Sequence, residues 1–308
     1  MQIQWFPGHM HKARKELARR LNDVDLVIEM LDARIPFSSE NPMLAELRGD
    51  KPCLKVLTKI DLADPFVTEQ SIPVLEQSSS AKVVCIDTTD SISRDTVITA
   101  CKSIAPNTID AVRGIQTLVA GIPNVGKSTL INLLAGRAIA NTGDEPAITK
   151  RQQRVDLQNG VVIFDSPGVL WPNLENPNGG VRLAISGAIR NTAFSYLDVA
   201  PFLAELLRDR YPDCLHHRFA IADVNHTGDA IIEMIGKARG CLVRGGTVDA
   251  ERAATILINE YQSGKLGRIT LETPQDHAAE LEHVAIRREE KAAKKAARAA
   301  AKKERRVR

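Results

Sequence analysis

The chain has 308 residues, of which 44% are hydrophobic and 26% are charged, an ordinary composition for a globular protein. No apolar run approaches the roughly 18 residues that a membrane-spanning helix needs, and the first residues lack the basic start and apolar core of a signal peptide. These features argue against the membrane and secreted classes. We therefore expect a cytoplasmic protein with no membrane partner.

The five cysteines are scattered through the chain and none forms a C-x-x-C pair, which favours a reducing compartment and plain core thiols. Cys214 with His216 and His217 is the one grouping that suggests a metal site. Because no second ligand pair follows at a zinc spacing, we give this interpretation little weight.

The net charge of +3 hides an asymmetry. Residues 287–308 carry eleven Lys and Arg against three Glu, a net of +8, so the rest of the chain is mildly acidic. Basic tails of this kind usually bind nucleic acid or another polyanion. A solvated tail that only aids solubility is the alternative.

Short apolar stretches alternate with helical patterns over the first half of the chain, which predicts a mostly parallel sheet covered by helices on both faces. An Asn159-Gly160 turn between two further apolar runs predicts a hairpin. The strands are expected at 25–32, 53–57, 82–87, 115–121, 153–157 and 161–165, and the helices at 10–21, 66–77, 93–104 and from Lys127 onward.

Beyond about residue 190 the strand signal fades and apolar spacings of three and four predict helices at 197–210, 228–238 and 249–262. The Pro- and Gly-rich segment 171–180 is expected to be a loop. We therefore predict three parts: a nucleotide-binding α/β domain at 1–190, a small all-helical domain at 191–285, and a basic tail at 286–308. The tail is short and like-charged, so it should be largely unfolded when free.

The segment Gly121–Ser128 matches the P-loop pattern G-x-x-x-x-G-K-[ST], and it follows a predicted strand and opens a predicted helix. Its glycines allow backbone N–H groups to approach phosphates, and the helix N-terminus adds partial positive charge. Lys127 should reach the β- and γ-phosphates, and the Ser128 hydroxyl should bind Mg²⁺. The nucleotide-binding residues of this turn are expected to be Asn124, Val125, Gly126, Lys127, Ser128 and Thr129.

Asp165-Ser-Pro-Gly168 lies about 40 residues further on, directly after an apolar strand. In that context Asp165 is expected to hold Mg²⁺, and Gly168 to offer its N–H to the γ-phosphate. Thr149 is our candidate for a switch threonine that closes on Mg²⁺. Thr142 is its rival, and an ordinary loop threonine is the third possibility.

Thr58-Lys59-Ile60-Asp61 follows another predicted strand and resembles the guanine motif N-K-x-D. Asp61 would accept hydrogen bonds from N1–H and the 2-amino group of guanine, and Lys59 would lay its stem along the purine. Thr58 replaces the usual Asn and loses the two donors of the amide, so we expect less secure packing of this loop against the P-loop. A plain surface turn is the alternative, and a second base-flanking loop at 87–91 is placed by position only.

The base motif precedes the P-loop by about 60 residues, the reverse of the usual order, which indicates a circularly permuted, three-layer P-loop NTPase fold. This order, with Trp5-Phe-Pro-Gly-His9-Met, Asp32-Ala-Arg-Ile-Pro36 and Asn41-Pro42, resembles the circularly permuted ribosome-assembly GTPases of the RbgA/YlqF type. The resemblance covers residues 1–285. It implies a GTPase that binds GTP, GDP and Mg²⁺ and acts on the large ribosomal subunit and its rRNA.

The resemblance also suggests two mechanistic roles. Val169 stands where Ras-like proteins place a catalytic glutamine, so the family's proposed replacement, here His9, would orient the attacking water. A role for His9 in capping or supporting a turn is the alternative. Asn124 is similar to the residue with which related GTPases recruit K⁺ beside the phosphates.

Two other hypotheses compete with this one: a metabolic P-loop kinase or ATPase, against which Asp61 argues, and an RNA-binding module in which the nucleotide is only structural. We assume a monomer.

Overall fold

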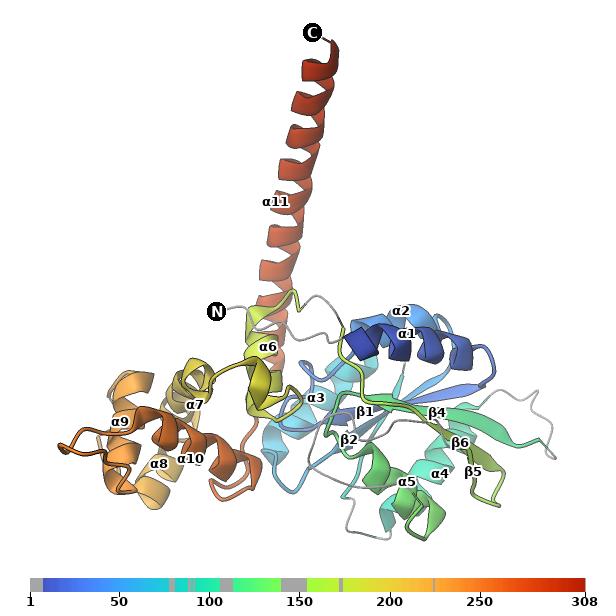
Figure 1. Cartoon of the computed structure of the whole chain (residues 1–308). Coiled ribbons are helices and arrows are strands. Elements are labelled where there is room, and N and C mark those ends of the chain that lie inside the picture. The colour runs from blue at the N-terminus through green and yellow to red at the C-terminus, as the bar shows by residue number, and fades with distance from the viewer. Residues whose placement is uncertain are drawn as a thin grey trace.

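The molecule combines a three-layer α/β part with a separate group of helices and one long helix that projects away from both (Figure 1). The sheet holds six strands in the order β3-β2-β1-β4-β6-β5. The computed structural model describes residues 8–77, 81–87, 90, 92–105, 113–139, 154–171, 174–223 and 225–307, without side chains at 8–11 and 296–307.

All neighbouring strands of the sheet are parallel except β5 and β6. The β5–β6 pair is the hairpin expected from Asn159-Gly160, and its turn uses positive φ angles at Gln158 and Gly160. The six predicted strands are thus confirmed within a few residues: β1 Leu26–Asp32, β2 Cys53–Thr58, β3 Lys82–Cys85, β4 Ile115–Gly121, β5 Arg154–Asp156 and β6 Val161–Asp165.

Helices cover both faces of the sheet because its central strands are apolar on both sides. On one face α1 (Gly8–Leu21), α2 (Pro42–Arg48) and α3 (Pro65–Gln77) pack against inward residues of β1, β2 and β4. The opposite face is covered by α4 and α5, which pack on alternate residues of the same strands. Their bounds are Ile92–Ile104 for α4 and Lys127–Ala135 for α5.

The predicted loop at 171–180 is partly wrong, because α6 begins at Pro177 and continues to Ile185. Asn176 caps it by accepting a hydrogen bond from the N–H of Asn178, and Pro177 occupies the first helical position. The helix is almost entirely buried, so tertiary contacts outweigh the poor helix propensity of its two glycines.

Four helices beyond α6 pack together around a shared apolar core, to one side of the sheet in Figure 1. A short 3₁₀ turn, η1 (Asn191–Ala193), leads into them. The group comprises α7 Tyr196–Arg210, α8 Pro212–Phe219, α9 Gly228–Ala238 and α10 Ala250–Gln262. The all-helical character expected for this region is therefore confirmed.

The basic C-terminal segment departs from its prediction. Instead of an unfolded tail, a single helix, α11, runs from Pro274 to Val307 (Figure 1). Its distal part is rich in Ala, Lys, Arg and Glu and contains no Gly or Pro, so helix propensity is high. Because the helix starts at Pro274, the basic segment extends an existing helix and does not bear the cost of nucleation.

Among the described residues no helix is both long and apolar enough to cross a membrane. In the same residues no group of three or more His, Cys, Asp and Glu side chains is arranged to hold a metal ion. The predicted fold class, a mostly parallel P-loop α/β sheet followed by helices, is confirmed.

Candidate functional site: a nucleotide site at the carboxyl edge of the sheet

The P-loop lies between β4 and α5, at the carboxyl edge of the sheet. Gly121 ends β4 so close to β1 that a Cβ there would approach the Met30 carbonyl oxygen to 2.7 Å. Gly126 has a φ of 101°, in the left-handed region that favours glycine, and the helix begins at the next residue. The two glycines of the motif are therefore needed for a close approach and for a left-handed turn.

Lys127 is buried and folds back on its own loop. Its ammonium donates hydrogen bonds to the carbonyls of Ile122 at 2.6 Å and Gly121 at 3.2 Å. Burial lowers the pKa of Lys127 to about 8, with the nearby Asp165 carboxylate opposing the shift and Lys59 adding to it. A cation destabilised by burial is a natural partner for a phosphate that enters the loop.

Asp165 ends β6 beside Val119 of β4 and is 1% exposed. Ser128, in the first turn of α5, is half-buried. A hydroxyl and a carboxylate are the hard oxygen ligands that Mg²⁺ prefers, so these residues fit the ion assigned to them. Thr149 and its rival Thr142 lie outside the described residues.

Gly168 rests directly on the P-loop. A Cβ at this position would come within 2.8 Å of the Pro123 Cα and 3.1 Å of the Lys127 ammonium nitrogen. The structure thus brings the D-x-x-G segment to the P-loop, with the N–H of Val169 donating to the Gly121 carbonyl at 3.3 Å. The Val169 side chain is 3% exposed within an apolar cluster, so it cannot orient a water molecule.

The loop at Thr58–Asp61, here called the base-reading loop, is fastened to the P-loop by Thr58. The buried Thr58 hydroxyl lies 2.7 Å from the Val125 carbonyl and 3.1 Å from the Leu31 carbonyl, and its single proton serves these two acceptors. The expectation of insecure packing was therefore wrong, because the Thr58 hydroxyl reaches a carbonyl of the P-loop. Asp61 follows in an exposed turn, three residues from this contact.

A buried ionic network underlies the base-reading loop. Lys59 has a φ of 59° and its ammonium lies 2.9 Å from Asp32 Oδ2. Asp32 also accepts two hydrogen bonds from the guanidinium of Arg34. Burial disfavours the charge on Asp32, but Arg34 and Lys59 outweigh it and hold the Asp32 pKa below its usual range. Arg34 continues to the Ser186 carbonyl at 3.4 Å and lies over the ring of Tyr261.

The remaining P-loop residues differ in their surroundings. Asn124 is half-buried, has a φ of 57°, and donates through Nδ2 to the Gly187 carbonyl at 2.8 Å. Val125 is fully buried and Thr129 is exposed on α5. Asn124 therefore joins the P-loop to the segment that follows α6.

His9 lies in the first turn of α1, but its side chain falls outside the described residues. Further along α1, Ala13, Leu17 and Leu21 belong to the same apolar cluster as Val169. Helix α1 thus packs on the side of the sheet that carries the D-x-x-G segment. Of the proposed second base-flanking loop, residues 88, 89 and 91 lie outside the described set.

Sequence reasoning gave no role to Asn41, which the structure places between two parts of the site. Its Nδ2 donates to the Val169 carbonyl at 2.9 Å, while its Oδ1 accepts from the first N–H groups of α2. Its own N–H donates to the buried carboxylate of Glu29. Burial and the neighbouring Glu40 raise the Glu29 pKa to about 7. The Asn41-Pro42 pair had counted only toward the family resemblance, and no local pattern could reveal the contact with Val169.

Comparison with known proteins agrees with this geometry. Residues 116–209 match the family described as 50S ribosome-binding GTPase. Ribosome biogenesis GTPase A of Bacillus pumilus is 40% identical over 89% of this chain and 100% of its own length. The Bacillus cereus protein of that name is 38% identical over 92% of this chain and 98% of its own.

A solved structure of GNP-bound YlqF from T. maritima superposes with a TM-score of 0.63 at 26% identity, covering 86% of this chain and 99% of that one. Its GDP-bound counterpart gives a TM-score of 0.61. The permuted order of motifs, the geometry of the site and the near full-length similarity agree, and the chain belongs to the ribosome biogenesis GTPase A family.

Proposed function

We propose that this GTPase is a cytoplasmic assembly factor for the large (50S) ribosomal subunit, which binds rRNA in its GTP state and leaves after hydrolysis. The observation that supports this most directly is the Thr58 contact with Val125, which brings a guanine-type motif to a P-loop across the permuted sheet. The similarity to ribosome biogenesis GTPase A over about nine-tenths of the chain supplies the assembly context.

In the proposed nucleotide complex each motif has a separate task. Asp61 accepts the N1 and N2 protons of guanine, which adenine does not offer. Lys127 leaves the Ile122 carbonyl for the β- and γ-phosphates, and its charge is thereby compensated. Ser128 and Asp165, with Thr149 as the switch residue, hold Mg²⁺, which would neutralise phosphate charge.

The proposed switch reads the γ-phosphate at Gly168, whose N–H would donate a hydrogen bond to it. Any shift there reaches Val169, the next residue. Its N–H donates a hydrogen bond to the Gly121 carbonyl, and its carbonyl accepts one from the Asn41 side chain. Helix α6 follows this segment, and its buried Arg182 pairs with Glu272 at 2.9 Å. The nucleotide state thus has a physical route from the phosphates to the residues that precede α11.

Hydrolysis requires a group that orients water, and Val169 cannot provide it because its side chain is buried in an apolar cluster. We assign this task to His9, at the start of the helix that shares that cluster. Replacing His9 by Ala should slow subunit-stimulated hydrolysis by about 10²–10⁴-fold, the usual contribution of an acid–base group, without weakening GDP binding. If the variant bound GDP as much more weakly as it hydrolysed GTP more slowly, His9 would have a structural role instead.

We also propose that K⁺ binds beside Asn124 and supplies positive charge to the transition state, as an arginine finger does elsewhere. The fixed, left-handed backbone of Asn124 at the rim of the P-loop supports this assignment. Replacing K⁺ by Na⁺ should then lower the hydrolysis rate of the native chain, and the Asn124→Ala variant should lose that difference.

The basic segment 287–308 is the proposed RNA contact outside the nucleotide site. Its eleven Lys and Arg residues lie on or beyond the distal part of α11, which projects away from the sheet (Figure 1). Each phosphate that the segment neutralises steepens the salt dependence of binding. Truncation before residue 287 should therefore weaken subunit binding and flatten its dependence on salt, and an unchanged slope would exclude this contact.

Co-sedimentation with purified large subunits tests the proposal. The full chain should pellet with subunits in a non-hydrolysable GTP analogue and much less in GDP or in ADP. Lys127→Ala should abolish the dependence on nucleotide. If both proteins bound subunits to the same extent in every nucleotide, an RNA-binding module with a merely structural nucleotide would be favoured. If subunit binding in ADP equalled that in the GTP analogue, an ATPase would be favoured.

A further inference from the structure

A segment outside the nucleotide motifs lies against the base-reading loop. Residues 264–272, here called the strap, connect α10 to α11. The strap N–H of Ile269 donates to the Leu62 carbonyl at 2.9 Å, and that of Leu271 donates to the Arg34 carbonyl at 2.8 Å. The strap therefore joins the chain just beyond the base-reading loop although it lies some 200 residues later in the sequence.

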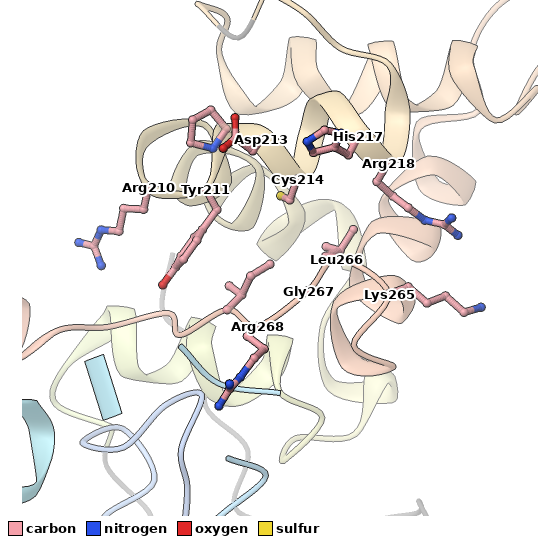
Figure 2. A pocket seen from close by; sticks show the side chains of 12 residues that line it. Arg210, Tyr211, Asp213, Cys214, His217, Arg218, Lys265, Leu266, Gly267 and Arg268 are labelled. Atoms are coloured by element: carbon pink, nitrogen blue, oxygen red, sulfur yellow. The ribbon is translucent and has the colours of Figure 1, made fainter. Parts of the chain in front are cut away.

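Arg268 of the strap forms hydrogen bonds with residues on either side of Asp61, the proposed guanine-binding carboxylate. Its Nε donates to the Ala63 carbonyl at 2.9 Å and its Nη2 to the Ile60 carbonyl at 2.8 Å. One planar guanidinium thus holds two carbonyls that flank Asp61. Figure 2 shows the side chains of Arg268 and Lys265 extending in different directions.

Two further contacts fix the end of the same turn. The Thr270 hydroxyl accepts from the Asp64 N–H at 3.0 Å, and the Tyr211 hydroxyl donates to Asp64 Oδ2 at 3.1 Å. Asp64 in turn caps α3 through the N–H of Phe66. With Thr58 fastened to Val125 at the other end, the turn that carries Asp61 is held from both sides.

The strap also faces the helical group. Together with α7, α8 and the residues between them it lines a pocket of about 470 Å³, seen in Figure 2. Arg268 and Tyr211, which contact the turn that carries Asp61, both belong to its lining. A shift of the helical group against the strap would therefore act on the same residues that hold the base-reading loop.

We infer that Arg268 is a positioning residue for guanine recognition, through which the strap sets the affinity and base selectivity of the nucleotide site. The inference rests on the proposed role of Asp61. A carboxylate distinguishes guanine from other bases only when it accepts hydrogen bonds from both N1–H and the 2-amino group. This requires that the loop carrying the carboxylate be held in one position. Charge-assisted hydrogen bonds from a bidentate guanidinium have the strength and geometry to fix it.

The test compares GDP with IDP, which lacks the 2-amino group and so offers Asp61 one donor instead of two. Calorimetric titration of the full chain should show that Arg268→Met weakens GDP binding by about five- to thirtyfold, the size of one to two such hydrogen bonds, and weakens IDP binding less. The matched control is Lys265→Met, which removes an exposed strap cation whose side chain extends in another direction than Arg268 in Figure 2; it should change neither affinity. Arg268→Lys should be intermediate because it can hold only one carbonyl well.

An unchanged ratio of GDP to IDP affinity in Arg268→Met would overturn the inference, since a purely structural defect would weaken both nucleotides alike. Thermal unfolding of the nucleotide-free variants shows whether they are folded. Should Arg268→Met not fold, the Arg268→Lys variant must by itself narrow the ratio of GDP to IDP affinity, or the inference fails.

A double-mutant cycle with Asp61→Ala separates this inference from the proposed function. If Arg268 acts through Asp61, then Arg268→Met should have no further effect on GDP affinity once Asp61 is removed, whereas additive effects would contradict it. If Asp61→Ala alone leaves GDP affinity unchanged, the proposed guanine site itself is wrong. If Asp61→Ala weakens GDP binding while Arg268→Met does nothing, only the role of Arg268 is rejected.

Discussion

The hydroxyl of Thr58 lies 2.7 Å from the carbonyl oxygen of Val125, and this contact joins the end of β2 to the turn after β4. The two strands flank β1 in the sheet and run parallel to it, so their carboxyl ends meet at one edge. Chain order is therefore irrelevant to the site: a loop that precedes the P-loop by about 60 residues still reaches it.

Replacing Thr58 by Val should leave the Val125 carbonyl without its hydroxyl donor in a buried position while preserving side-chain shape. We expect a loss of about 1–3 kcal/mol in the free energy of unfolding, the cost of a buried unsatisfied group, together with weaker GDP binding. Urea unfolding and GDP titration measure the two effects. The Thr58→Asn variant should bind GDP more tightly than the Thr58→Val variant. Tighter GDP binding by the valine variant would contradict the assigned contact.

Replacing Asp61 by Asn should reverse the base preference. The carboxylate accepts from both guanine donors, at about 1.5–3 kcal/mol each, so its loss should weaken GDP binding by roughly 10²–10⁴-fold. An amide offers one donor and one acceptor, which suits the 2-oxo group of xanthine. Competition between GDP and XDP measures the change. Retention of the guanine preference in the variant would place base recognition elsewhere.

Nucleotide affinity should depend on pH through Lys127, whose pKa burial lowers to about 8 in the free protein. Phosphate binding favours the charged amine, so the bound pKa is higher and a proton is taken up on binding between the two values. GDP affinity should fall as the pH rises above 8, measured below the pH at which guanine loses its N1 proton. Calorimetry in two buffers of different ionisation enthalpy detects the proton, and its absence would mean that Lys127 is already charged.

Glu29 should make the free protein less stable as the pH rises. Its pKa is about 7 in the fold against 4.5 when exposed, so the folded state binds the extra proton between these values. Stability linked to this group is complete below pH 4.5 and is lost as the pH rises toward and through 7. Glu29→Gln keeps an acceptor for the Asn41 N–H, and at pH 8 it should be more stable than the native chain by up to about 3 kcal/mol. If the free energy of unfolding depended on pH in the same way in both proteins, the raised pKa assigned to Glu29 would be wrong.

Local sequence patterns located all six strands and the helices that have clear apolar periodicity. They missed α11, whose basic part was expected to be unfolded. They also missed α2, α6 and α8, which have seven to nine residues and are fixed by caps or by tertiary burial. Helix α6 contains Asn-Pro-Asn-Gly-Gly at its start, which is typical of a loop. Its Arg182, buried between Glu272 and Glu280, shows the long-range ion pairs that override that preference.

The P-loop, the D-x-x-G segment and the base-reading loop are local motifs, so their residues could be found from the sequence alone. Their supports could not, because Asn41, Arg34 and Arg268 act across contacts with residues far away in the chain. The Thr58 substitution was misjudged for a related reason: the contacts of its hydroxyl with the Val125 and Leu31 carbonyls cannot be read from the local sequence.

The most direct test of the account is GTP hydrolysis by the full chain, measured in K⁺ with and without purified large ribosomal subunits. We predict slow turnover by the protein alone and a rate that rises steeply as subunits are added, until the protein is saturated. Rapid hydrolysis without subunits, or a rate that subunits leave unchanged, would contradict the assignment as a subunit-triggered assembly GTPase.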